Sequence, residues 1–568
     1  MFLLAVSVPF TTLLFARGSF SLPSADDWAQ LSKSLGGRLL QATPLAAPCF
    51  SVVNGRNSTV DTQACAAVQA GYTVPDFRSP RFPAYMLPQW ETCQRAEEKC
   101  LLDASNPSNP LATSGVCQQG SISEYYVVVS GAEDVQTAFA FSAKTGVRLS
   151  IKASGHDYKG RSSSKGSLNL WTRNLTSLAY TPNFTPEGGD KSYERTITMG
   201  AGVPFEDLYA FADQNNLTVI GGYHQTISPS GGWVMGGGHS VLSPVYGLGV
   251  DRVLQFKIVT PDGEYRTANE FQNKDLFWAL RGGGGSTFGV VIESTMLVEP
   301  RFKLQVASFN FAKTSTNYQP FLKLIVDESY TWGTEGWGGH MGPTNLINVN
   351  PLLTTEQAIE SLKNATAYVQ AQNGTIVIEE LPSWQAFFTK YVTSAEASVG
   401  VENTLLSRLI PTNLFTSETG RTTLTNAMVQ MVDQYGINPY IVVGTPFLFK
   451  GPANATSVTP AWRNALWQIG GHSTWQFNAT VPEIRTQFQI ASNITQLLRD
   501  ITPGSGAYFN EGDVYEVNHE ESYWGVNYPA LLAIKKKYDP NSLLECWQCV
   551  GWKGAQDPRY DCYLSLSN

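Results

Sequence analysis

The spacing of hydrophobic and polar residues changes repeatedly between residues 125 and 220. Short runs of branched and aromatic residues predict strands, and between them apolar residues recur every three or four positions, which is typical of an amphipathic helix. A strand, a helix and a second strand therefore follow one another twice. The predicted elements are Tyr125–Val129, Ala132–Lys144, Val147–Lys152, Thr196–Met199, Phe205–Gln214 and Thr218–Ile220.

The next part of the chain predicts a hairpin and a glycine-rich connection. Val253–Thr260 and Glu264–Thr267 have strand patterns, and Pro261-Asp262-Gly263 between them is a turn sequence. A short helix is predicted at Asp275–Arg281, before a run of four glycines and a strand at Phe288–Leu297. Helices and strands are thus mixed throughout this part of the chain.

Beyond Pro300 the glycine-rich loops disappear, and about two hundred residues predict a second domain of α+β type. A last helix is expected near the C-terminus, with three lysines in its final turn that favour the negative end of the helix dipole. The predicted strands are Phe302–Phe311 and Tyr440–Phe449, and the predicted helices are Thr355–Gln372, Ser383–Val392, Thr422–Gln434 and Trp524–Asp539.

Length and composition agree with two large lobes. A chain of 568 residues exceeds what one hydrophobic core usually supports. Hydrophobic residues make up 42% and aromatic residues 12%, which excludes a chain that is mainly disordered. The net charge of −8, with scattered lysines and arginines, argues against nucleic acid as a partner.

The N-terminus and the cysteines indicate export. Met1–Ala16 is apolar but too short to span a bilayer, and it predicts a signal peptide at residues 1–21; no later apolar run reaches 18 residues. The eight cysteines favour disulfides within one domain, with the pairing left open. We expect a secreted glycoprotein that has no membrane segment once the signal is removed. The N-x-S/T sites are Asn57, Asn174, Asn183, Asn216, Asn364, Asn373, Asn454, Asn478 and Asn493.

Three glycine-rich loops follow or precede predicted strands at residues 153–160, 221–239 and 282–289. Because glycine allows the backbone to approach a ligand, three such loops favour a large anionic ligand held by backbone amides. A Rossmann site is excluded by the order of elements, since the four glycines here follow a helix and precede a strand. No Walker motif, G-x-S-x-G elbow or H-E-x-x-H motif occurs, and no metal site is expected.

His156 lies at the end of a predicted strand between Gly155 and Asp157. One interpretation is a turn histidine bonded to the backbone. The other is a nucleophilic imidazole attached to a cofactor, with the neighbouring glycine giving its ring room.

The segment Lys152-Ala-Ser-Gly-His-Asp-Tyr-Lys-Gly-Arg-Ser162 resembles the flavin-attachment loop of the berberine-bridge-enzyme-like oxidases, within the vanillyl-alcohol-oxidase and p-cresol-methylhydroxylase superfamily. The similarity runs in order from about Cys49 to Gly551 and is greatest to secreted fungal proteins described as isoamyl-alcohol-oxidase-like. Further matching motifs are Gly200-Ala-Gly202, Gly236-Gly-Gly-His-Ser240, Tyr246-Gly-Leu248, Asp275-Leu-Phe-Trp-Ala-Leu-Arg-Gly-Gly283, Phe288-Gly289 and Tyr523-Trp-Gly-Val-Asn-Tyr528.

This resemblance implies an α+β fold with a discontinuous FAD-binding domain and an inserted substrate domain. Residues 22–117 would form a cysteine-rich part of the FAD lobe, 118–305 the FAD-binding domain, 306–500 the substrate domain, and 501–568 a segment returning to the FAD lobe. His156 would bond the flavin 8α-methyl group. The other residues expected at the cofactor are Ser154, Gly155, Asp157, Arg161, Ser162, His224, Gly236, Gly237, Gly238, His239, Ser240, Phe288, Gly289 and Asn527.

One position departs from the family pattern. Many relatives carry a second covalent link through a cysteine, but here His224 occupies that position, and no cysteine lies between Cys117 and Cys546. We therefore expect covalent FAD held by His156 alone. Whether His224 contacts the flavin, orders a loop or serves catalysis is open.

The resemblance also implies the reaction. A hydroxyl-bearing small molecule would pass a hydride to FAD, and O2 would reoxidise the cofactor and yield H2O2. The proton acceptor should come from the loop that carries Tyr508, Asn510 and Glu511, although Glu511 could equally be a surface carboxylate. Alternatives are an oligosaccharide oxidase, the oxidative cyclisation or dehydrogenation of a natural product, and a redox-inactive glycoprotein of the same fold. A monomer is expected.

Substrate identity is poorly encoded in the sequence. Trp332, Trp337 and Trp384 in the second domain are candidates to stack on a sugar or an aromatic substrate, although most tryptophans only pack.

Overall fold

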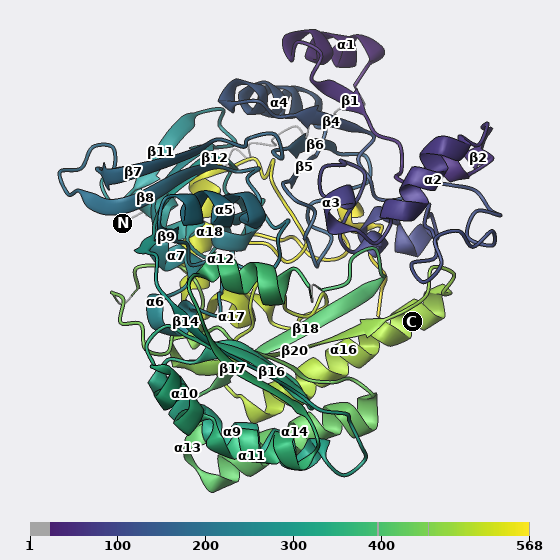
Figure 1. The fold of residues 1–568 in the computed structure, drawn as a ribbon. Coiled ribbons are helices and arrows are strands. Elements are labelled where there is room, and N and C mark those ends of the chain that lie inside the picture. The colour runs from purple at the N-terminus through teal and green to yellow at the C-terminus, as the bar shows by residue number, and fades with distance from the viewer. Residues whose placement is uncertain (1–22, 395–396, 453, 567–568) are drawn as a thin grey trace, which may run out of the picture.

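The computed structural model describes residues 23–394, 397–452 and 454–566. The signal peptide predicted at residues 1–21 lies outside these ranges. Figure 1 shows an upper lobe built from purple to teal segments and a lower lobe that is mainly green. Yellow segments from the C-terminal part of the chain lie among the elements of the upper lobe.

Two sheets form the upper lobe. The first has the strand order β1-β4-β6-β5, in which β4, β6 and β5 are parallel, and the second has the antiparallel order β11-β10-β12-β8-β7. The strands are β1 (Leu39–Gln41), β4 (Tyr125–Val128), β5 (Leu149–Lys152), β6 (Leu168–Trp171), β7 (Leu178–Phe184), β8 (Tyr193–Gly200), β10 (Val253–Val259), β11 (Tyr265–Asn269) and β12 (Val290–Leu297). The predicted hairpin β10–β11 is confirmed.

Apolar stripes on short helices cover these sheets. Val135 and Phe139 of α4 pack into the core beneath the parallel strands, and Phe205, Leu208 and Tyr209 of α5 enter the core that surrounds the glycine loops. The helices of this lobe are α1 (Ala25–Ser34), α2 (Thr62–Gly71), α3 (Pro75–Arg78), α4 (Ala132–Thr145), α5 (Phe205–Gln214), α6 (Ser243–Tyr246), α7 (Gly249–Arg252) and α8 (Lys274–Leu280).

The lower lobe is one seven-stranded antiparallel sheet with helices packed on one face (Figure 1). The strand order is β17-β14-β16-β15-β19-β20-β18, with β14 (Leu304–Asn310), β15 (Gly338–Met341), β16 (Asn345–Asn350), β17 (Thr375–Leu381), β18 (Asn403–Pro411), β19 (Tyr440–Val443) and β20 (Ala465–Thr474). The helices on that face are α9 (Tyr318–Glu335), α10 (Thr355–Ser361), α11 (Lys363–Ala371), α13 (Asn413–Thr416), α14 (Glu418–Tyr435) and α16 (Val481–Ile501). Two short helices, α12 (Trp384–Phe387) and α15 (Ala461–Asn464), pack instead into the core that surrounds the glycine loops.

Side chains alternate in direction along three central strands, so neighbouring residues lie on opposite faces of this sheet. Met341, Ile441 and Ile469 pack into the core beneath the helices. His340, Val442 and Gln468 are cross-strand partners in neighbouring strands, so their side chains share the opposite face. That face therefore meets the upper lobe.

The C-terminal segment returns to the upper lobe with α17 (His519–Trp524) and α18 (Tyr528–Tyr538), and α18 packs against α8. The three lysines predicted to cap this helix differ in exposure: Lys536 and Lys537 are exposed, but Lys535 is buried. Its Nζ donates to the carbonyl of Thr287 at 2.7 Å and to a carboxylate oxygen of Asp539 at 2.6 Å. Lys535 thus ties α18 to the third glycine loop.

All eight cysteines are paired, which confirms the predicted disulfides. None lies in the lower-lobe sheet, and the pair Cys93–Cys562 joins two parts of the chain that are 469 residues apart. The other pairs are Cys49–Cys65, Cys100–Cys117 and Cys546–Cys549.

Some predicted elements end earlier or divide. The long strand expected at 440–449 stops at Val443, because Gly444 and Pro446 follow it and Leu448 instead donates its amide to Pro244. The helix expected at 355–372 is two helices that meet at Leu362. The helix expected at 524–539 begins at Tyr528, where Pro529 occupies its first turn.

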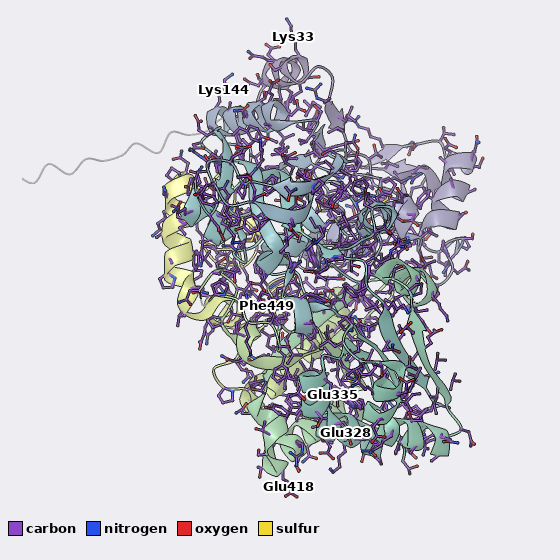
Figure 2. All side chains as sticks on the ribbon, turned by 60° about the vertical axis from the view of Figure 1, so that its left-hand side comes forward. Lys33, Lys144, Glu328, Glu335, Glu418 and Phe449 are labelled. Atoms are coloured by element: carbon purple, nitrogen blue, oxygen red, sulfur yellow. A yellow bond between two sulfur atoms is a disulfide. The ribbon has the colours of Figure 1, made fainter. Side chains whose placement is uncertain are left out.

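Figure 2 places labelled charged residues at both ends of the molecule. Lys33 and Lys144 lie at the outer end of the upper lobe, and Lys144 pairs with Asp27 at 2.9 Å. Glu328, Glu335 and Glu418 lie towards the outer end of the lower lobe. These residues are remote from the site described next.

Candidate functional site

A cavity opens where the end of β5 meets the glycine loops and a C-terminal loop. Ten residues predicted at the site are among the 25 that line it. They are Ser154, Gly155, His156, Asp157, Arg161, Ser162, Gly289, Tyr508, Asn510 and Glu511. Lining residues that the motif did not single out include Ile151, Ala153, Tyr158, Ile227, Ser228, Gly231, Gly232, Val290 and Val291.

The loop after β5 is organised by Gly155 and Asp157. Gly155 has φ +88°, and a Cβ there would lie 3.0 Å from Cε of Lys152, so both conformation and space call for glycine. The carboxylate of Asp157 accepts from the backbone amides of Lys159 at 3.0 Å and Ser162 at 2.5 Å. These bonds curve the chain back on itself and present His156 to the cavity.

His156 belongs to a short chain of hydrogen bonds. Its Nε2 lies 2.7 Å from the hydroxyl of Thr226, and that hydroxyl lies 3.3 Å from Nδ1 of His224. The two imidazole rings meet edge to face at 4.4 Å. Burial and the neighbouring His224 lower the pKa of His156 well below its usual value, and burial lowers the pKa of His224 to about 4. Both rings are neutral at physiological pH.

The cavity offers groups suited to a phosphate-bearing dinucleotide. The hydroxyls of Ser162 and Ser228 are buried, line the cavity and have no hydrogen-bond partner within the described ranges. A Cβ on Gly285 would lie 3.2 Å from Cα of Gly232, so side chains would narrow the gap between these two loops. Unused hydroxyls and glycine backbone are what a pyrophosphate group requires. The residues present therefore fit FAD.

Glu511 lies at the edge of the cavity, where the two lobes meet. Nε2 of His239 lies 3.1 Å from one carboxylate oxygen, and the amide of Gln468 donates to the other oxygen at 2.6 Å. His239 comes from the second glycine loop and Gln468 from the lower-lobe sheet. The carboxylate is thus fixed from both lobes while its side chain stays 22% exposed, unlike a free surface group.

Tyr508 and Asn510 support this carboxylate loop. Asn510 donates to the carbonyl of Gly232 at 2.9 Å and to the hydroxyl of Tyr508 at 2.8 Å, and it accepts from Arg161 at 3.1 Å. Burial raises the pKa of Tyr508 far above its usual value. The phenol therefore stays protonated at neutral pH.

An aromatic group with unused polar atoms lies on the sheet face that also carries Gln468, the donor to Glu511. Ring centroids of Tyr223 and His340 are 4.3 Å apart, and those of His340 and Tyr440 are 5.0 Å apart. The Tyr223 hydroxyl and both ring nitrogens of His340 are buried without a partner among the described residues. Burial lowers the pKa of His340 to about 3, so its ring is neutral. We name Tyr223, His340 and Tyr440 the aromatic wall.

Several predicted cofactor residues have other positions. The loop Gly236–Ser240, expected to line the dinucleotide, instead directs His239 to Glu511 and packs Gly237 against Tyr508. Asn527 donates to the carbonyl of Val458 at 2.9 Å. Phe288 is buried in the core, and His224 contacts the cavity through Thr226 and His156. The predicted residues outside the cavity lining are His224, Gly236, Gly237, Gly238, His239, Ser240, Phe288 and Asn527.

The tryptophans proposed to stack on a substrate are structural. Trp332 and Trp337 belong to the core beneath the lower-lobe helices, and their indole groups donate to Ser361. Trp384 is buried against Tyr209. Sequence reasoning missed Gln468, His340 and Tyr440, because strand alternation does not reveal which sheet face meets the cofactor lobe. It also missed Thr226 and Tyr223 in the second glycine loop, where only His224 was singled out.

Metal-binding clusters and membrane-spanning helices are both absent from residues 23–394, 397–452 and 454–566. In those ranges, no three His, Cys, Asp or Glu side chains gather as a metal ion would need. No helix within the same ranges is long and apolar enough to cross a bilayer.

Comparison with known proteins places the motifs in context. Residues 123–269 match the family described as FAD binding domain, and residues 507–550 match the family described as berberine and berberine like. The chain is 40% identical to FAD-linked oxidoreductase OXR2 of Pyricularia oryzae, over 96% of this chain and 95% of that protein. It is 30% identical to VAO-type flavoprotein oxidase VAO615 of Thermothelomyces thermophilus, over 94% and 92% of the two chains.

A solved structure has the same overall arrangement. The crystal structure of VAO-type flavoprotein MtVAO615 from Myceliophthora thermophila superposes with a TM-score of 0.82 at 28% identity, covering 94% of this chain and 96% of that one.

Proposed function

Because this chain belongs to the berberine-bridge-enzyme-like group of FAD-linked oxidoreductases in the vanillyl-alcohol-oxidase superfamily, we propose that it oxidises a hydroxyl group of a small molecule to a carbonyl. The α+β fold of this superfamily, predicted from the motifs, is confirmed. O2 is the proposed electron acceptor and H2O2 the second product, which the name of the flavoprotein oxidase relative supports.

The observation that carries this proposal is the position of Glu511. Its carboxylate lies at the edge of the cofactor cavity and is held by His239 and Gln468. FAD, when bound, supplies the hydride acceptor. Glu511 would take the hydroxyl proton of the substrate. Arg161, Asn510 and the loop after β5 would orient the end of the cofactor that carries the flavin ring.

The aromatic wall supports a substrate class. Neutral rings with unused donors and acceptors favour an uncharged, ring-containing molecule that carries hydrogen-bonding groups. We therefore favour a small ring-bearing alcohol over an oligosaccharide, which remains an outcome of the test below.

The test is peroxide release from the purified protein. Alcohols, phenolic lactones and oligosaccharides should be compared under air, with flavin bleaching followed without oxygen. We expect bleaching and peroxide with members of the first two classes. Turnover confined to oligosaccharides would replace the substrate proposal, and a colourless protein that binds no FAD would contradict the enzyme proposal as a whole.

We propose further that FAD is bonded to His156 alone. The ring lines the cavity, and His224 stands where relatives carry the second, cysteine link. Acid precipitation should leave the yellow colour with the protein, and His156→Ala should release it. Flavin freely extracted from the unmodified protein would contradict this attachment without touching the oxidase proposal.

Export is also proposed. Four disulfides, nine N-x-S/T sites and the apolar N-terminal run support a secreted, glycosylated protein. We propose a monomer as its oligomeric state. Mass analysis of the secreted protein before and after glycosidase treatment, with size-exclusion chromatography, tests all three points.

A further inference from the structure

Thr226 links two histidines, and the direction of its hydrogen bonds can be worked out. The backbone amide of Thr226 donates to Nδ1 of His224 at 3.3 Å. An amide N–H is always a donor, so Nδ1 of His224 carries no proton. The neutral His224 ring therefore has its proton on Nε2, which is buried and has no partner in the described part of the chain.

The position of the proton on His224 limits the directions of the remaining hydrogen bonds. The hydroxyl of Thr226 lies 3.3 Å from the same unprotonated Nδ1, so His224 gives the hydroxyl proton an acceptor. The Thr226 oxygen is then free to accept from Nε2 of His156 at 2.7 Å. With the hydroxyl proton directed to His224, His156 carries its proton on Nε2, and its Nδ1 lone pair is left for the cofactor cavity that the residue lines.

We propose that Thr226 and His224 are positioning residues for covalent flavin attachment, which hold His156 in its nucleophilic tautomer and receive its Nε2 proton. The inference rests on the attachment proposed above. It gives His224 a role at the position where relatives have a cysteine: a proton acceptor in place of a second bond to the flavin.

The attachment step balances as follows. A bond forms between Nδ1 of His156 and the 8α carbon of the flavin, and one C–H bond at that carbon breaks. The proton on Nε2 of His156 moves to the Thr226 oxygen as the Thr226 hydroxyl proton moves to Nδ1 of His224. Two electrons pass to the flavin ring. O2 takes up these electrons together with two protons, one from the broken C–H bond and the one received by His224, to give H2O2, and His224 returns to its neutral form.

The readout is the covalent share of bound flavin, so it is independent of turnover. Full-length protein from riboflavin-limited culture is given FAD in air, and flavin is measured in the acid precipitate and in the supernatant over time. Thr226→Val keeps the shape but removes the hydroxyl, and we expect it to slow attachment about 10²-fold or more, as for other lost proton acceptors. Thr226→Ser should restore a rate near that of the unmodified protein.

Two controls separate this role from packing. Thr218→Val makes the same change at a buried hydroxyl that has no partner among the described residues and lies outside the cavity lining, and it should leave the rate unchanged. His224→Phe should slow attachment, and adding Thr226→Val to it should cause little further loss, because both act in one chain.

The outcomes are distinct. Slow attachment in Thr226→Val, rescue by Thr226→Ser and a non-additive double variant support the inference. Equal rates in Thr226→Val and the unmodified protein, or additive losses, overturn it while leaving attachment through His156 standing. An unmodified protein that never forms the bond overturns the inference together with the attachment. Peroxide release in the substrate panel reports separately on the oxidase.

Discussion

At the residue scale, the site depends on keeping most of its titratable groups neutral. Burial lowers the pKa of His156 and His340 and raises that of Tyr508, so none of them changes charge near neutral pH. Glu511 is the one carboxylate of this group; it is partly exposed and is held by donors from both lobes. We propose this carboxylate as the proton acceptor.

Replacing Glu511 by Gln tests that role directly. The change is nearly isosteric but removes the acceptor, so flavin reduction by a substrate should slow about 10²–10⁴-fold. Stopped-flow absorbance measures the rate, and bound FAD should be unchanged. Glu418→Gln, at the exposed start of α14 in the far lobe (Figure 2), is the matched control. An unaltered rate in Glu511→Gln would transfer the role to another group.

A second carboxyl makes stability depend on pH. Glu402, just before β18, is 2% exposed, and burial raises its pKa to about 8. The folded state therefore holds a proton that the unfolded chain loses above about pH 4.5. The free energy of unfolding is therefore highest at low pH. It falls by up to about 1.4 kcal/mol per pH unit as the pH rises to about 8.

Glu402→Gln should remove this dependence. The melting temperature of the variant should exceed that of the unmodified protein increasingly between pH 5 and pH 8, as measured by thermal unfolding with circular dichroism. Glu418→Gln should follow the unmodified protein at every pH. A constant difference across this range would mean that Glu402 does not titrate there.

Residues near the attachment motif were predictable, and those from the lower lobe were not. His156, Asp157 and Arg161 lie within one short segment whose glycines and strand already indicated a ligand loop. Gln468 and His340 reach the site only because three strands align their side chains on one face. That register depends on long-range pairing, which no local pattern encodes.

At the element scale, α18 shows how helix packing supports the cofactor loops. Lys535 is buried, and its Nζ donates to Thr287, to Leu544 and to the carboxylate of Asp539. Thr287 belongs to the glycine loop that carries Gly285 and Gly289 of the cavity. The predicted helix was found, but its lysines were interpreted only through the dipole, since sequence does not show which face is buried.

Lys535→Met should destabilise the protein by about 3–5 kcal/mol, because it leaves the buried Asp539 without its cation. FAD content should also fall as the third glycine loop loosens. Thermal unfolding and the ratio of flavin to protein absorbance measure both effects. Lys536→Met, on the exposed side of the same turn, should change neither. Equal behaviour of the two variants would contradict the anchoring role.

Local patterns predicted short elements better than long ones. The bounds of α5 match the predicted helix, because its apolar stripe and its ends are encoded within ten residues. The strand expected to reach residue 449 stops at Val443, where Leu448 bonds Pro244 in the other lobe. Such contacts between distant segments override local propensity.

At the scale of the whole molecule, the upper lobe is closed by the bond between Cys93 and Cys562. The cavity takes residues from around positions 151–162, 227–235, 285–291 and 508–511, so the two ends of the chain must stay together. By loop entropy, a crosslink over 469 residues stabilises about 3 kcal/mol more than the one over 16 residues between Cys49 and Cys65.

Replacing Cys93 and Cys562 together by Ser should therefore lower the melting temperature more than the paired replacement of Cys49 and Cys65. Thermal unfolding without reductant makes the comparison, and non-reducing peptide mapping checks that the remaining pairs are intact. Equal losses in the two double variants would mean that loop length does not govern the contribution.

The cofactor cavity is built from distant parts of the sequence, so it can be completed only late in the synthesis of the polypeptide. His156 leaves the ribosome early, but Glu511, which completes the cavity, follows 355 residues later. At roughly 5–20 residues per second, this interval lasts on the order of tens of seconds. The upper lobe must spend that time with its cavity unfinished and its apolar lining open. Loading of the cofactor is therefore an event of the finished polypeptide, and a nascent chain stalled before residue 500 would be expected to emerge without colour.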